Sequence, residues 1–134
     1  MIVSLDNPQT VPAPPARYSH LARIDFGSGA LLILAGQLAL DEAGQVVAPG
    51  NVRAQAERIL EVTTALLAAH GGSLADVVHI RTFMTDLGDL PGFAEVRARH
   101  FPGTPPASTT VEVSKLFRDG AVLEVEITAA VPTR

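Results

Sequence analysis

The sequence contains no cysteine and few charged residues. Without cysteine the protein has no disulfide bonds, no thiolate metal ligands and no cysteine nucleophile. Charged residues make up 18% of the chain, only 10 residues are Lys or Arg, and the net charge is −4. A dedicated nucleic-acid-binding protein usually has a basic excess, so we expect no nucleic-acid partner.

Long hydrophobic runs are also missing. The longest, residues 30–35, is far too short to span a bilayer, and residues 1–8 lack the basic start and apolar run of a secretory signal. The chain is nevertheless 47% hydrophobic over 134 residues, which is enough for the core of one domain of ordinary size. We expect a single cytoplasmic domain over residues 1–134, with no membrane partner.

Turn and cap signals predict the element order β-β-α-β-α-β-β. Four prolines within residues 7–16 disfavour helix and central strand, so residues 1–16 are expected to form an extended N-terminal arm. Asn51 and Asp89 are predicted N-caps of two helices, which end at residues 71–72 and near residue 100. Strands are expected over residues 17–26, 31–40, 77–87, 107–116 and 121–131. Glycine-containing turns at residues 27–29 and 117–120 predict that the first two and the last two strands form hairpins.

The predicted strand over residues 31–40 is apolar at nearly every position, so both of its faces should be buried. Two helices can cover only one face of a five-stranded sheet. We therefore predict an α+β domain with a mixed sheet and two helices on one face. The other face should pack sheet to sheet in a homo-oligomer.

Two glutamates in the predicted last strand are the main candidates for chemistry. Alternation places Glu124 and Glu126 on one face, and in the preceding strand it places Ser108 and Thr110 on one face. Such carboxylates fit either a solvent-exposed sheet edge or a cleft in which one of them orients water or acts as a general base. Gly36 interrupts an apolar strand, which marks a bulge or a close backbone approach. The four histidines have no ligand spacing, so no metal site is expected.

The segment at residues 106–116, followed by Leu-Glu-Val at residues 123–125, resembles the signature of the RidA/YjgF/UK114 family. Segments at residues 16–18, 34–37, 51–56 and 77–87 also match, so the resemblance covers essentially the whole chain. It implies a chorismate-mutase-like domain in a homotrimer. It further implies a small-metabolite site in each cleft between subunits, without a metal or organic cofactor.

The resemblance also implies roles for particular residues. Characterised family members hydrolyse reactive 2-imino acids, or their enamine tautomers, to 2-oxo acids and ammonia. Glu124 matches the glutamate that orients or activates water, and Tyr18 and Gly36 match residues that shape the pocket. Ser108 stands where the family has an arginine that binds the substrate carboxylate, and Thr110 stands where it often has cysteine.

Ser108 weakens the case for the family's usual reaction. Charge-assisted hydrogen bonds are worth about 1.5–3 kcal/mol each, whereas a serine hydroxyl has one donor and no charge. A 2-imino acid would therefore bind more weakly by about two orders of magnitude, unless Arg81, Arg17 or Arg118 supplies the missing cation. We predict a poor 2-iminopropanoate deaminase. The alternatives are a hydrolase for a different enamine or a non-catalytic trimer that binds a metabolite or a protein.

Overall fold

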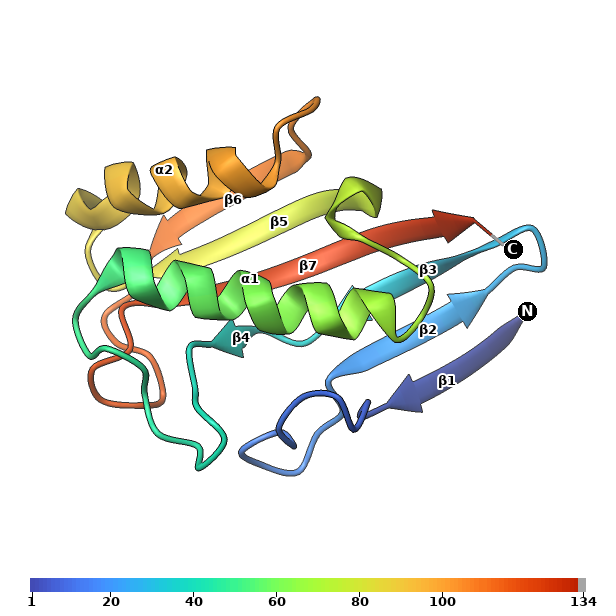
Figure 1. The fold of residues 1–134 in the computed structure, drawn as a ribbon, viewed down its shortest axis with the longest axis horizontal. Coiled ribbons are helices and arrows are strands. Elements are labelled where there is room, and N and C mark those ends of the chain that lie inside the picture. The colour runs from blue at the N-terminus through green and yellow to red at the C-terminus, as the bar shows by residue number, and fades with distance from the viewer. Residues whose placement is uncertain (133–134) are drawn as a thin grey trace.

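The computed structural model describes residues 1–132, which form one mixed sheet with two helices on one face (Figure 1). The strands are β1 (Ile2–Asp6), β2 (Leu21–Asp25), β3 (Gly29–Leu34), β4 (Gln37–Leu38), β5 (Val77–Met84), β6 (Ala107–Glu112) and β7 (Leu123–Pro132). The helices are α1 (Val52–Ala68) and α2 (Leu90–His100), and short 3-10 turns occupy Leu74–Asp76 and Leu87–Asp89. The strand order is β1-β2-β3-β7-β5-β6, and β4 also pairs with β7. This confirms the predicted α+β class.

The N-terminal half differs from the prediction in its strands. Within the expected arm, β1 pairs antiparallel with β2, a strand that begins only at Leu21. The predicted hairpin is confirmed: the Phe26 N–H donates to the Gly29 carbonyl at 2.8 Å, and Gly27 adopts a φ of +90°. The prediction of one continuous strand over residues 31–40 is wrong. The chain leaves the sheet after Leu34 and returns as the two-residue β4.

The predicted hairpin between the last two strands is wrong. β7 lies between β3 and β5 and pairs antiparallel with both, whereas β6 lies at the sheet edge, parallel to β5 (Figure 1). Every second residue of β7 from Leu123 to Val131 is buried, but none of the six residues of β6 is. The apolar β7 buries more surface in the sheet centre than it would beside the polar edge strand.

The helices confirm most of the predicted end signals. The Asn51 side chain accepts a hydrogen bond from the Ala54 N–H at 3.1 Å, as an N-cap should. After α1 the chain turns through Gly71, with a φ of +76°, and the Gly72 N–H donates to the Leu67 carbonyl at 2.9 Å. Asp89 precedes α2, but its side chain makes no capping bond.

The sheet face opposite the helices is uncovered in the single chain. Leu32 and Leu34 lie under the helices and are 0% and 3% exposed, whereas Ile33 points the other way and is 43% exposed. The predicted burial of the second face depends on another copy of the chain and stays a prediction. Val3 and Val111 are also exposed on the uncovered face by strand register. Within residues 1–132, no helix is long and apolar enough to cross a membrane.

Candidate functional site

Glu124 lies on the uncovered face of the sheet, near the start of β7. In strand register it stands between Phe83 of β5 and Leu38 of β4. These apolar neighbours leave the carboxylate half-buried, and the loss of hydration is the main reason that its pKa is raised above the usual glutamate value. The negative charge of nearby Glu126 raises the pKa further. Glu124 is therefore a stronger base than an exposed glutamate.

Gly36 makes room for this carboxylate. A Cβ atom at residue 36 would lie only 3.0 Å from both Cδ and Oε1 of Glu124. Glycine thus allows the backbone to pack directly against the carboxylate, which is the close approach that the strand interruption suggested.

Tyr18 belongs to the same group of residues. Its pKa is raised, chiefly by partial burial and next by the negative charge of Glu124, while the positive charge of Arg118 acts in the opposite direction. The phenol is therefore protonated at neutral pH and can donate a hydrogen bond. The chain thus brings together Tyr18, Gly36 and Glu124, three of the residues singled out by the resemblance.

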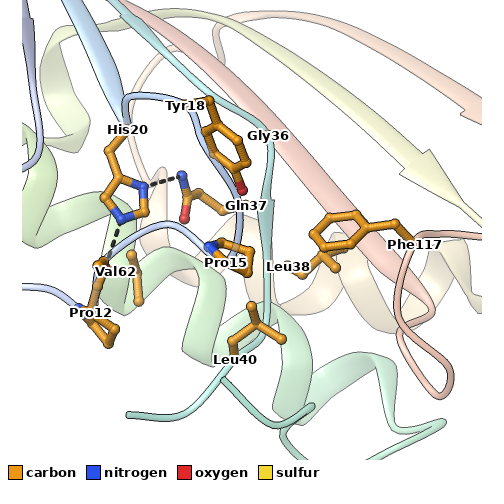
Figure 2. A pocket seen from close by; sticks show the side chains of 11 residues that line it. Pro12, Pro15, Tyr18, His20, Gly36, Gln37, Leu38, Leu40, Val62 and Phe117 are labelled. Carbon is orange, nitrogen blue, oxygen red and sulfur yellow. Dashed lines mark hydrogen bonds between the residues drawn. The ribbon is translucent and has the colours of Figure 1, made fainter. Parts of the chain in front are cut away.

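Tyr18 and Gly36 also line a cavity of about 30 Å³, large enough for about one water molecule (Figure 2). Its wall includes Tyr18, Gly36, Gln37 and Phe117, together with the buried ring of His20. The Gln37 amide donates to Nδ1 of His20 at 3.3 Å, and Nε2 of His20 donates to the Pro12 carbonyl at 2.7 Å, which assigns the proton to Nε2. Through these two hydrogen bonds, His20 links the proline-rich segment at residues 7–16 to Gln37 of β4.

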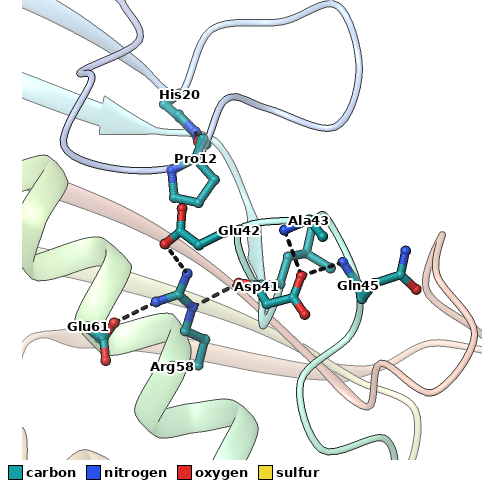
Figure 3. Close-up of polar contacts among 9 residues, drawn as sticks. Pro12, His20, Asp41, Glu42, Ala43, Gln45, Arg58 and Glu61 are labelled. Carbon is teal, nitrogen blue, oxygen red and sulfur yellow. Dashed lines mark hydrogen bonds and ion pairs between the residues drawn. The ribbon is translucent and has the colours of Figure 1, made fainter.

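Arg58 anchors the loop that follows β4 (Figure 3). Its Nε donates to the Leu40 carbonyl at 2.8 Å, and its guanidinium pairs with Glu42 and Glu61. Asp41 closes the loop by accepting hydrogen bonds from the Ala43 and Gln45 N–H groups, both at 2.9 Å. Sequence reasoning missed this support and that of His20, because no local pattern pairs residues so far apart in the chain.

Arg81 lies on the same face as Glu124, but its positive charge is already paired with the carboxylate of Glu126. Its Nε and Nη2 atoms lie 3.0 and 2.9 Å from the same Glu126 oxygen. A guanidinium neutralised in this way is a weaker candidate for the missing cation than an unpaired one.

Ser108 and Thr110 lie on the opposite face from Glu124. They stand beside Ile80 and Thr82, which point under the helices, whereas Glu124 stands beside Phe83 on the uncovered face. Along β5, Ile80 is three residues from Phe83, or about 10 Å. One chain therefore does not bring Ser108 and Glu124 together. A site that uses both must take them from two copies of the chain.

Two of the other histidines, His70 and His100, each contact one carboxylate. Nε2 of His70 lies 2.8 Å from Asp6, and Nε2 of His100 lies 2.9 Å from Glu57. Throughout residues 1–132, no group of three or more His, Cys, Asp or Glu residues is arranged to hold a metal ion.

Known proteins are similar to this chain in sequence and in fold. A family model described as Endoribonuclease L-PSP matches residues 8–131. The chain belongs to this family, also called RidA/YjgF. "Protein DfrA" of Myxococcus xanthus is 43% identical over 112 residues, which are 84% of this chain and 83% of that protein. "3-Aminoacrylate deaminase RutC" of Acinetobacter baylyi is 34% identical over 124 residues, which are 92% of this chain and 94% of that protein.

Solved structures of RidA/YjgF proteins agree with the fold described above. RidA from the Antarctic bacterium Psychrobacter sp. superposes with a TM-score of 0.83 at 30% identity, covering 96% of this chain and 99% of that one. The yeast protein YEO7 superposes with a TM-score of 0.86 at 28% identity, covering 97% and 99%. The similarity to these structures therefore extends over almost the whole chain.

Proposed function

We propose that this RidA/YjgF protein hydrolyses the C–N bond of a small imine or enamine and releases ammonia. The observation that carries the proposal is Glu124, a half-buried carboxylate of raised pKa packed against Gly36 and close to Tyr18. The similarity to a relative named 3-aminoacrylate deaminase supports the same chemistry.

The proposed reaction needs one base and one water molecule. The Glu124 carboxylate accepts a proton from water as the water oxygen bonds to the imine carbon. Glu124 returns this proton to the nitrogen as the C=N π bond breaks, which gives an amino alcohol. The hydroxyl proton then moves through Glu124 to the same nitrogen, the C–N bond breaks, ammonia leaves and the carbon becomes a carbonyl. The Tyr18 phenol is placed to donate a hydrogen bond to the substrate. An enamine enters the same route after it takes up a proton at carbon.

The test is an assay in which an amino acid oxidase generates imines in situ and semicarbazide competes for them. We expect the protein to speed the release of ammonia from at least one imine or enamine, with a weak effect on 2-iminopropanoate because Ser108 has no charge. If no imine or enamine reacts faster, the protein is a non-catalytic binding protein and the proposal is wrong.

Gly36→Ala is expected to lower kcat by about 10-fold or more. The added methyl group would meet Glu124 at 3.0 Å and displace the base, and small misplacements of a catalytic group are costly. The melting temperature, measured in parallel, should change little because the flexible end of Glu124 can move aside. Unchanged kcat would contradict the placement of Glu124 against Gly36 in the working site.

We further propose that the chain assembles as a homotrimer through the uncovered face of its sheet. This face carries exposed apolar residues such as Ile33, and a site containing Ser108 and Glu124 needs two copies. Light scattering should give three times the mass of the chain. Ile33→Lys should lower that mass, whereas Ile2→Lys should not, because Ile2 is 72% exposed on the other face. A monomeric wild-type protein would refute the assembly.

A further inference from the structure

A second, larger cavity lies between α2 and the start of β6, on the face of the sheet covered by the helices. Its volume is about 480 Å³, within the range of small-molecule sites. The wall is mostly apolar and includes Ile80, Ala94, Ala98 and Phe101. Tyr18, Gly36 and Glu124 do not line this cavity.

Arg97 supplies a positive charge to the cavity wall. Its guanidinium lies 5.1 Å from the centre of the Phe93 ring, and it has no carboxylate partner within residues 1–132. By contrast, Arg99 on the same helix pairs with Glu57 at 2.8 Å. A guanidinium oriented by an aromatic ring and not neutralised by an acid is prepared to bind an anion.

Ser108 lines the same cavity as Arg97. We propose that Arg97 binds the substrate carboxylate in this cavity, in place of a cation at position 108, and that the substrate is a 2-imino acid with a large apolar side chain. This inference rests on the proposed hydrolysis of imines. The small Ser108 side chain leaves space beside β6 and offers a hydroxyl as a second donor to the carboxylate.

The size of the cavity sets the expected preference among 2-imino acids. The methyl group of 2-iminopropanoate would leave most of the apolar wall uncovered, whereas the side chain of the imine from leucine would contact it. Each buried CH₂ strengthens binding about fourfold, and the two imines differ by three carbons. The imine from leucine should therefore be preferred on the order of 50-fold.

The reacting carbon must meet Glu124 from a second copy of the chain. In one chain, Ser108 and Glu124 are on opposite faces of the sheet. β6 is an edge strand with no buried residue, so its cavity is accessible to another copy. Arg97 of one chain would bind the substrate carboxylate, and Glu124 of another chain would take a proton from the water that attacks the imine carbon.

The experiment compares Arg97→Gln with Arg99→Gln and Arg118→Gln, using imines made from leucine and from alanine. We expect Arg97→Gln to lower kcat/KM for the leucine imine at least 10-fold. The Arg99 variant should match the wild type. NMR titration with the product 4-methyl-2-oxopentanoate should show at least 10-fold weaker binding in Arg97→Gln and unchanged binding in Glu124→Gln.

These measurements separate the inference from the proposed reaction. If Arg97→Gln binds and reacts like the wild type, or if Arg118→Gln shows the loss instead, the inference is wrong although the reaction stands. If the keto acid binds through Arg97 but no imine is hydrolysed, the cavity is supported and the reaction is wrong.

Mixed assemblies test the origin of the two residues. Arg97→Gln and Glu124→Gln chains, each weakly active alone, should regain activity when co-assembled, because about a quarter of the clefts would then contain both native residues. No gain on mixing would show that the two residues do not act across chains.

Discussion

Glu124→Gln is expected to reduce turnover of the best imine substrate by about 10²–10⁴-fold, the usual contribution of a general base. The amide keeps the shape of the side chain but cannot accept a proton from water. The native activity should also fall in acid, as Glu124 becomes protonated, at a pH above that expected for an exposed glutamate, because burial and Glu126 raise its pKa.

The same substitution should stabilise the fold at neutral pH. The pKa of Glu124 is higher in the folded protein than in the unfolded chain, so ionised Glu124 opposes folding. This penalty is fully present above the folded pKa and disappears below the unfolded value of about 4.3. We expect a melting temperature about 2 °C or more above that of the wild type at pH 8, and no difference at pH 3.

Glu61→Gln is the matched control for Glu124→Gln. Glu61 lies on the exposed side of α1, across the sheet from Glu124, and without its charge Arg58 still bonds Leu40 and pairs with Glu42. Its amide variant should keep the wild-type turnover. Full activity in Glu124→Gln would exclude Glu124 as the base.

Gln55→Leu is expected to lower the free energy of unfolding by about 3 kcal/mol or more. Gln55 is fully buried on α1 and bonds three backbone groups: its amide nitrogen donates to the Ala48 and Gly120 carbonyls at 3.2 and 2.9 Å, and its oxygen accepts from the Val122 N–H at 3.0 Å. Leucine has a similar size but would leave these groups without partners. Urea denaturation measures the loss.

Gln45→Leu controls for the change in side-chain chemistry. Gln45 is exposed in the loop after β4, so its replacement should change stability by no more than about 0.5 kcal/mol. A loss below about 1 kcal/mol in Gln55→Leu would mean that water replaces the three bonds. Through its bonds to Gly120 and Val122, Gln55 holds the segment that contains Phe117 and Arg118. Gln55 therefore also helps to position these residues of the site.

Local signals predicted local structure well. Asn51 caps α1 as its amide predicts, and Gly27 allows the β2–β3 turn. The turn signal at Gly120 was equally clear, and Gly120 does adopt a φ of +87°, but the chain turns there without joining neighbouring strands. A glycine reports the local backbone shape and not the partner of the strand that follows.

The opposite-facing positions of Ser108 and Glu124 show the limit of residue patterns. Alternation correctly placed Glu124 with Glu126 and Ser108 with Thr110. It could not relate the two pairs, because two strands that are adjacent in sequence are separated by β5 in the sheet.

The sequence by itself determined the family, the α+β class, the two helices and the identity of the candidate base, since motifs and caps depend on residues close together in the chain. Only the tertiary structure decided that β7 occupies the sheet centre, that Gly36 packs against Glu124, and that Arg97 shares a cavity with Ser108. These facts depend on contacts between distant segments, and such contacts are selected by the total apolar surface that the whole chain can bury.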